Sequence, residues 1–229
     1  MSKTDELNKL FVDWKTRKLL FCEDGILSET DYEKADIKVL FVLKDVHNAP
    51  VNDVQDAQSE DGKNIDMRKA LRENGEKDEK TWKPLIKWLS WLIHVDTDTY
   101  KYLAFMNLKK DEGWKSVSAA TLEQYAERDQ DLIREQIRII APDVIIACSR
   151  DVFEILRDTV FKDKESSAPA FPKTHLDYGQ TFIIRYGDKP TVVVNYHHPT
   201  AREKNSYSDE QHKQNMESIR EFVWRSKQQ

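Results

Sequence analysis

The stretch Ile37-Lys38-Val39-Leu40-Phe41-Val42-Leu43 runs directly into the polar segment Lys44-Asp45-Val46-His47-Asn48. A short, nearly continuous apolar run of this kind is typical of a buried strand and favours a central position in a parallel sheet. Open α/β sheets bind their ligands just beyond the carboxyl ends of their strands. The sequence therefore predicts that Asp45 and His47 lie at the edge of the sheet where a functional site is expected.

Composition limits the class of protein. The chain has 229 residues, of which 39% are hydrophobic and 34% are charged. These values are typical of a globular protein with a charged surface, and we expect a single domain spanning residues 1–229. The net charge of −5 gives no sign of a generally basic surface, so a nucleic-acid contact would have to be local.

The sequence shows no targeting or membrane signal. No apolar run approaches the roughly 20 residues that a membrane-spanning helix needs, and the polar N-terminus lacks the apolar core of a signal peptide. The two cysteines, Cys22 and Cys148, fit reduced thiols and are too few for a four-cysteine iron–sulfur cluster. We therefore expect a cytoplasmic protein, a monomer, that does not contact membranes.

Hydrophobic periodicity predicts alternating strands and helices. Apolar residues recur at helical spacing over residues 4–21, 82–95, 118–140, 150–161 and from 208 onward. Short apolar runs predict further strands over residues 100–106, 144–147, 181–185 and 191–195, the last two as a hairpin. Ser208 and Gln211 have the spacing of a capping box. This alternation predicts an α/β protein, a three-layer αβα sandwich with a central, mostly parallel sheet.

Polar residues follow three of the predicted strands. Asp45 follows the first strand, Asn107 follows Met106 at the end of the second, and His197-His198 follows the last. The carboxyl ends of parallel strands meet at one edge, so we expect these residues to line a single cleft. Strand alternation allows only one of the two histidines to face it.

These strand-end motifs, taken in order, resemble the uracil-DNA glycosylase superfamily. That family carries G-Q-D-P-Y after its first strand, an Asn at the end of the second, an apolar strand followed by a helix, and a late H-P-S motif. The corresponding segments here are Leu43-Lys44-Asp45-Val46-His47, Met106-Asn107-Leu108, Asp143-Val144-Ile145-Ile146-Ala147-Cys148 and His198-Pro199-Thr200-Ala201-Arg202. The resemblance spans residues 37 to 224 and implies the fold of that superfamily.

The resemblance implies a metal-independent, cofactor-free DNA glycosylase that excises a damaged or deaminated base such as uracil. Asp45 would orient water and stabilise the cationic sugar, while His198 would donate to the oxygen where negative charge develops. Asn107 would read the edge of a flipped base, with His47 at the position of the family's tyrosine. The residues expected to contact single- or double-stranded DNA are Arg202, Lys44 and Lys109.

Two alternatives remain open at this point. The sequence departs from the family motif around Asp45, and no aromatic residue occurs between Phe41 and Trp82 to stack on a base. A catalytically inactive nucleic-acid or nucleotide-binding module on the same fold would also fit this pattern. The second alternative is a metal hydrolase, because Asp45, His47 and the His197-His198 pair have spacings that can ligate a metal.

Overall fold

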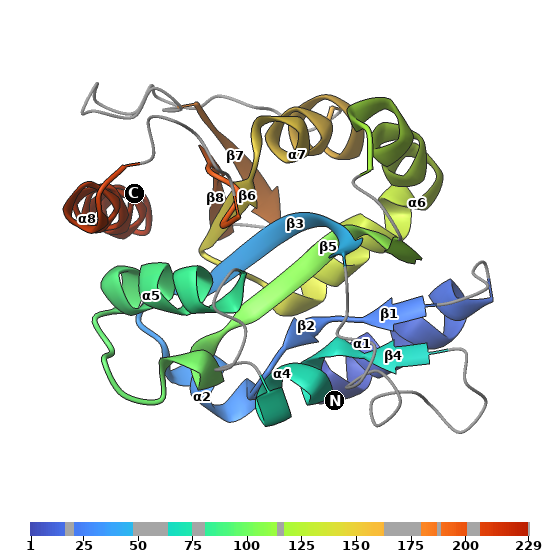
Figure 1. Ribbon diagram of the computed structural model, residues 1–229, viewed down its shortest axis with the longest axis horizontal. Coiled ribbons are helices and arrows are strands. Elements are labelled where there is room, and N and C mark those ends of the chain that lie inside the picture. Colours follow the sequence, from blue (N-terminus) through green and yellow to red (C-terminus); the bar gives the residue numbers. More distant parts are fainter. Residues whose placement is uncertain are drawn as a thin grey trace.

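The predicted first strand is the centre of the sheet. In the computed structural model, β3 (Val39–His47) pairs in parallel with β5 (Ala104–Gly113) on one side and with β6 (Val144–Cys148) on the other. β8 (Lys189–Tyr196) continues the parallel array beyond β6 (Figure 1). The prediction of a central, mostly parallel sheet is therefore confirmed.

The two edges of this sheet are antiparallel. β2 (Gly25–Ile26) pairs with β5, and β7 (Thr181–Tyr186) pairs with β8 as the predicted hairpin. The resulting order is β2-β5-β3-β6-β8-β7. A separate two-stranded sheet pairs β1 (Phe21–Glu23) in parallel with β4 (Asn64–Asp66).

The structure describes residues 1–16, 21–47, 64–74, 81–113, 117–162, 180–186, 189–200 and 207–228, without the side chains of residues 46, 47, 64, 74, 112 and 113. No helix within these ranges is long and apolar enough to cross a membrane.

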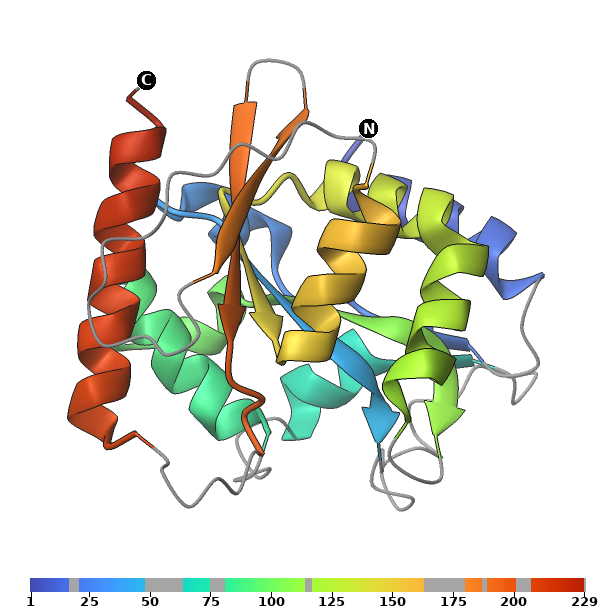
Figure 2. The same ribbon diagram turned by 90° about the horizontal axis from the view of Figure 1, so that it is seen from above.

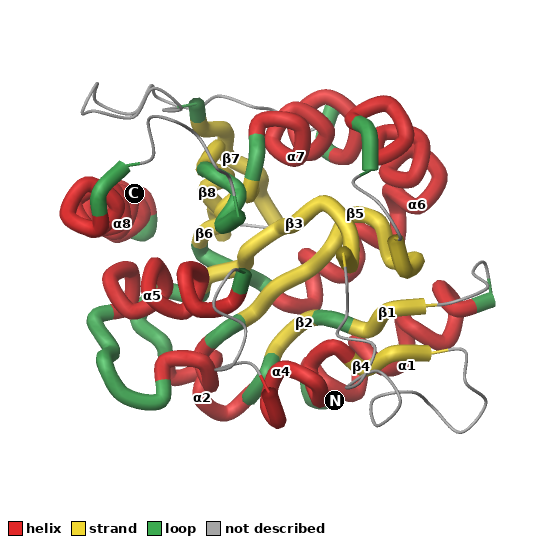
Figure 3. Tube along the Cα trace, viewed as in Figure 1, coloured by secondary structure: helices red, strands yellow, loops and turns green. Residues whose placement is uncertain are grey.

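Helices cover both faces of the six-stranded sheet, and each face has its own core. On one face lie α4 (Met67–Asn74), α5 (Trp82–Ile93) and α8 (Asp209–Ser226). On the other lie α1 (Lys3–Lys15), α6 (Ala119–Ile140), α7 (Arg150–Ile155) and the π-helical turn η3 (Leu156–Val160) (Figures 2 and 3). Two short elements, α2 (Glu29–Lys34) and the 3-10 turn η2 (Thr99–Tyr102), complete the described structure.

Strand alternation explains why β3 is apolar on both faces. Phe41 and Leu43 belong to the core under α5 and α8, whereas Leu40 and Val42 belong to the core under α1, α6 and α7. Successive side chains of a strand point to opposite faces, so a strand covered on both sides needs apolar residues at every position.

Several predicted boundaries were wrong. β5 does not end at Met106 but continues through Asn107 to Gly113, because β3 supplies a parallel partner for that segment. The first helix ends at Lys15 and not at residue 21, since Phe21 already belongs to β1. The helix predicted to reach Phe161 is α-helical only to Ile155 and then widens into η3.

Candidate active site

Asp45 and Asn107 lie on neighbouring strands near the carboxyl edge of the sheet. In the parallel register of β3 and β5, Leu43 is the partner of Asn107 and Asp45 is the partner of Lys109. Asp45 is thus one two-residue step closer to the carboxyl edge than Asn107. Because in-register partners of a parallel pair point to the same face, Asn107 and Asp45 occupy successive positions on one face of the sheet.

Asn107 is more deeply placed than the sequence predicts. Its side chain is only 3% exposed, and its backbone N–H donates to Oδ2 of Asp24 at 2.7 Å. Its side-chain Nδ2 points to the same oxygen at 3.4 Å. Sequence reasoning missed Asp24, which lies between β1 and β2 without any motif around it.

The turn after β8 sets the protonation pattern of His198. The backbone N–H of Thr200 donates to Nδ1 of His198 at 3.2 Å, and the Thr200 hydroxyl lies 2.8 Å from the same nitrogen. A ring nitrogen that accepts a backbone N–H carries no proton itself, so the neutral imidazole has its proton on Nε2. His198 is therefore arranged as a hydrogen-bond donor through Nε2.

The surroundings of His198 also disfavour its charged form. Burial and, to a smaller extent, the positive charge of Lys44 lower the pKa of His198 to about 4. The imidazole is consequently neutral near pH 7, and the tautomer fixed by Thr200 is the form present. A neutral N–H donor can stabilise developing negative charge on an oxygen through a hydrogen bond, without transferring its proton.

The two lysines expected to contact DNA already have partners. Lys44 Nζ lies 2.5 Å from Oδ2 of Asp151, in the first turn of α7. Lys109 is 8% exposed; its amine donates to the backbone oxygen of Asp111 at 3.0 Å and lies 5.4 Å from the ring centroid of Tyr125. Both amines are therefore held at the carboxyl edge by groups of the protein itself.

His197 faces different surroundings from His198. Its ring lies 4.9 Å from that of Tyr207 and 5.9 Å from that of His212. Tyr196, on the strand itself, forms a hydrogen bond of 2.6 Å to Nδ1 of His212. His197 thus belongs to an aromatic cluster between the end of β8 and the start of α8, whereas His198 is influenced by Lys44 of β3.

Two predicted site residues lie wholly or partly outside the described residues. Arg202 lies outside the described residues. His47 is the last residue of β3, but its side chain is not described. Within the part of the chain that the structure does describe, no group of three or more His, Cys, Asp or Glu side chains is arranged to hold a metal ion.

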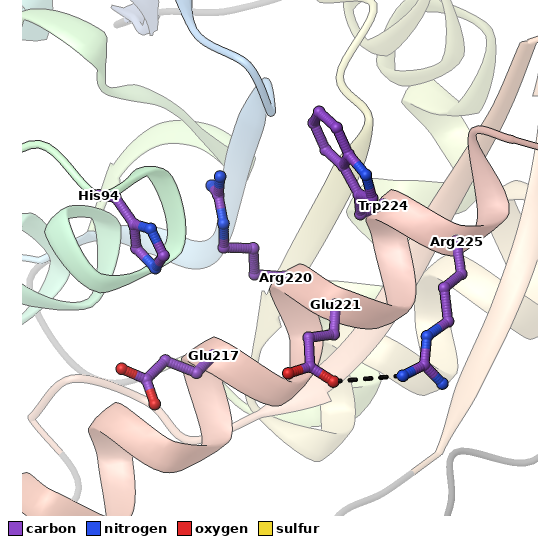
Figure 4. A pocket seen from close by; sticks show the side chains of 6 residues that line it. All are labelled: His94, Glu217, Arg220, Glu221, Trp224 and Arg225. Carbon is purple, nitrogen blue, oxygen red and sulfur yellow. Dashed lines mark hydrogen bonds and ion pairs between the residues drawn. The ribbon is translucent and has the colours of Figure 1, made fainter.

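A pocket of about 410 Å³ lies elsewhere on the molecule (Figure 4). It is lined by His94, Glu217, Arg220, Glu221, Trp224 and Arg225. The lining comes mainly from the C-terminal half of α8, and Figure 2 shows this half of the helix toward the end of the sheet opposite the β3 and β8 arrowheads. Its mixed charges and distance from the strand ends separate it from the candidate site.

Comparison with known proteins adds no family assignment: no family model matches the sequence, and no curated protein matches it significantly.

Proposed function

We propose that this protein is a DNA glycosylase that hydrolyses the N-glycosidic bond of a damaged or deaminated base such as uracil. The observation that carries the proposal is His198, a neutral histidine whose Nδ1 is occupied by Thr200 and whose Nε2–H is left as a donor at the end of β8. Its monomeric state and cytoplasmic location stay predictions.

The chemistry of the bond explains why such a donor is useful. Cleavage leaves positive charge on the sugar and negative charge on the departing base, and water then supplies hydroxide to the sugar carbon and a proton to the products. A neutral donor at a base carbonyl stabilises the negative charge as it forms. A carboxylate on the opposite side stabilises the sugar cation and orients the water.

Asp45 and Asn107 have suitable positions for the remaining roles. Asp45 lies near the carboxyl end of β3, the strand whose Lys44 influences His198. Asn107 occupies the preceding position on the same face of the neighbouring strand, and its amide offers the donor and acceptor that reading a base edge needs. Both arrangements support the proposal, and so does the motif order along the sequence.

An excision assay tests this function. Single- and double-stranded oligonucleotides carrying uracil, hypoxanthine or xanthine are incubated with the protein, and abasic sites are detected by strand cleavage. We expect excision of at least one of these bases. Asp45→Asn and His198→Gln should each reduce kcat by about 100-fold or more, the scale for removing one group that stabilises the transition state.

Two exposed residues provide matched controls. Asp96→Asn and His94→Gln make the same changes outside the candidate site, on the segment at and after the end of α5. Both control variants should retain wild-type activity. Absence of excision on every substrate by folded wild-type protein would refute the glycosylase proposal, and DNA binding without excision would instead favour the binding-module alternative.

A further inference from the structure

Asp24 is the centre of a buried polar cluster beside the candidate site. Its Oδ1 accepts from Nζ of Lys110 at 2.5 Å and from Nε2 of Gln136 at 2.7 Å. Its Oδ2 accepts from the backbone N–H of Asn107 at 2.7 Å. Asp24, Lys110 and Gln136 are each 0% exposed, so the carboxylate is held entirely by protein donors.

Asp24 lies at the outer edge of β5, beyond the short segment of β5 that pairs with β2. β2 pairs with β5 only at Ala104 and Phe105, so the outer edge of β5 has no strand partner at Asn107 within β2. The carboxylate of Asp24 takes that place and receives the N–H that a further strand would have received. Gly25 permits the abrupt turn between Asp24 and β2, with φ at +129°, a conformation that favours glycine.

This arrangement fixes the orientation of the Asn107 amide. A carboxylate only accepts hydrogen bonds, so the amide group facing Oδ2 of Asp24 must be the nitrogen. The amide oxygen then points away from Asp24. Among the residues that the structure describes, none donates a hydrogen bond to this oxygen.

We propose that Asp24 is a positioning residue, which holds Asn107 with its amide nitrogen inward so that the amide oxygen is presented to an N–H donor on the edge of a bound base. This role rests on the proposed glycosylase function, in which Asn107 reads the base. Lys110 and Gln136 support the role by keeping the carboxylate in place. Asp24 itself does not touch the substrate.

The surroundings of the buried Lys110 amine agree with its role of holding the Asp24 carboxylate in place. Burial lowers the pKa of the Lys110 amine, while the charge and hydrogen bond of Asp24 oppose that shift. A buried amine at this position is tolerated because the carboxylate lies directly against it. Replacing Asp24 alone would leave that charge without its partner, so the test variant must change both residues.

Nuclear magnetic resonance of the free protein tests the orientation without any need for activity. The side-chain amide signal of Asn107 is assigned by its loss in Asn107→Asp. In wild-type protein this amide should exchange its hydrogens slowly. In the paired variant Asp24→Asn/Lys110→Met, the signal should shift and the backbone N–H of Asn107 should exchange about tenfold faster or more, because an anionic acceptor has been lost.

Kinetics on the folded paired variant test the consequence. We expect kcat for base excision to fall about tenfold or more while KM for the oligonucleotide changes less than about twofold, since phosphate contacts dominate DNA affinity and base orientation acts at the chemical step. Asp143→Asn is the matched control, because Asp143 also accepts a backbone N–H, that of Lys38 just before β3, at 2.8 Å, but lies at the amino end of the sheet. It should leave kcat and the Asn107 signals unchanged.

Two results would overturn the positioning role. One is an Asn107 side-chain amide that exchanges freely in wild-type protein or is unchanged in the paired variant. The other is an equal fall of kcat in the paired variant and in Asp143→Asn. If wild-type protein excises no base, the proposed function fails, but the resonance measurements still decide whether Asp24 orients Asn107.

Discussion

A three-residue turn sets the chemistry of His198. Thr200 lies two residues after His198, and both the backbone N–H and the hydroxyl of Thr200 form hydrogen bonds with Nδ1 of His198. The turn therefore selects the tautomer, while burial and Lys44 keep the ring neutral. His198 is therefore a neutral hydrogen-bond donor. A histidine that works as a general acid would instead carry a positive charge and give up a proton.

The depressed pKa of His198 has a consequence for stability. In the unfolded chain the imidazole takes up a proton near its usual pKa of about 6.5, whereas in the folded protein it does so only near pH 4. Between these values the unfolded state binds more protons, so the free energy of unfolding falls as the pH is lowered. This contribution is fully present above about pH 6.5.

Urea denaturation at about pH 7 and about pH 4.5 measures this effect. Wild-type protein should lose more stability on acidification than His198→Gln, with a difference of about 2 kcal/mol. His212, whose pKa burial also lowers, is present in both proteins and cancels in the comparison. An equal loss in the two proteins would contradict the lowered pKa.

At the scale of elements, helix ends follow local chemistry. Ser118 caps α6 by accepting from the N–H of Thr121, and Ser208 forms the predicted capping box with Gln211 at the start of α8. Such a cap satisfies amide groups that the first turn leaves without an intrahelical partner. α8 shares one face of the sheet with α4 and α5, so its cap stabilises part of that layer.

The cap of α8 gives a prediction about this element. Ser208→Ala should lower the free energy of unfolding by about 1 kcal/mol, because the N–H of Gln211 loses its acceptor. The control is Ser218→Ala on the same helix, where the hydroxyl bonds the carbonyl of Gln214 and alanine has the better helix propensity. Thermal or urea unfolding distinguishes them, and a Ser218→Ala loss as large as that of Ser208→Ala would contradict the capping role.

At the scale of the whole molecule, the buried cluster joins distant parts of the chain. Asp24 precedes the edge strand β2, Lys110 and Asn107 belong to β5, and Gln136 belongs to α6. The cluster therefore ties the N-terminal segment to the sheet and to a helix of one outer layer. Its members have no solvent exposure beyond the 3% of Asn107, so water cannot replace a lost partner.

This cluster should behave as an energetic unit. Lys110→Met alone leaves the Asp24 carboxylate without its counter-charge and should cost about 3–5 kcal/mol. The paired variant Asp24→Asn/Lys110→Met should cost less than the sum of the two single changes, because no buried charge remains. A double-mutant cycle by urea denaturation measures the coupling, and strict additivity would show that the two groups do not depend on each other.

The sequence alone determined the features that have a local physical cause. Short apolar runs predicted β3, β6, β7 and β8, because a buried strand shows itself as several apolar residues close together in the sequence. Helical periodicity predicted α5, α6 and α8, and the spacing of Ser208 and Gln211 predicted the start of α8. Asp45, Asn107 and His198 each follow an apolar run, and β3 pairs in parallel with β5 and β6, and β6 in parallel with β8. Their role as one site stays a prediction.

Only the tertiary structure decided the features that depend on distant partners. β5 continues past Met106 because β3 pairs with it, although the residues beyond Leu108 are charged. Lys44 is paired with Asp151, and Asn107 with Asp24, across segments that no sequence spacing connects. A hydrogen bond between residues far apart leaves no periodic trace in the sequence, so the surroundings of a polar side chain are fixed only when the chain folds.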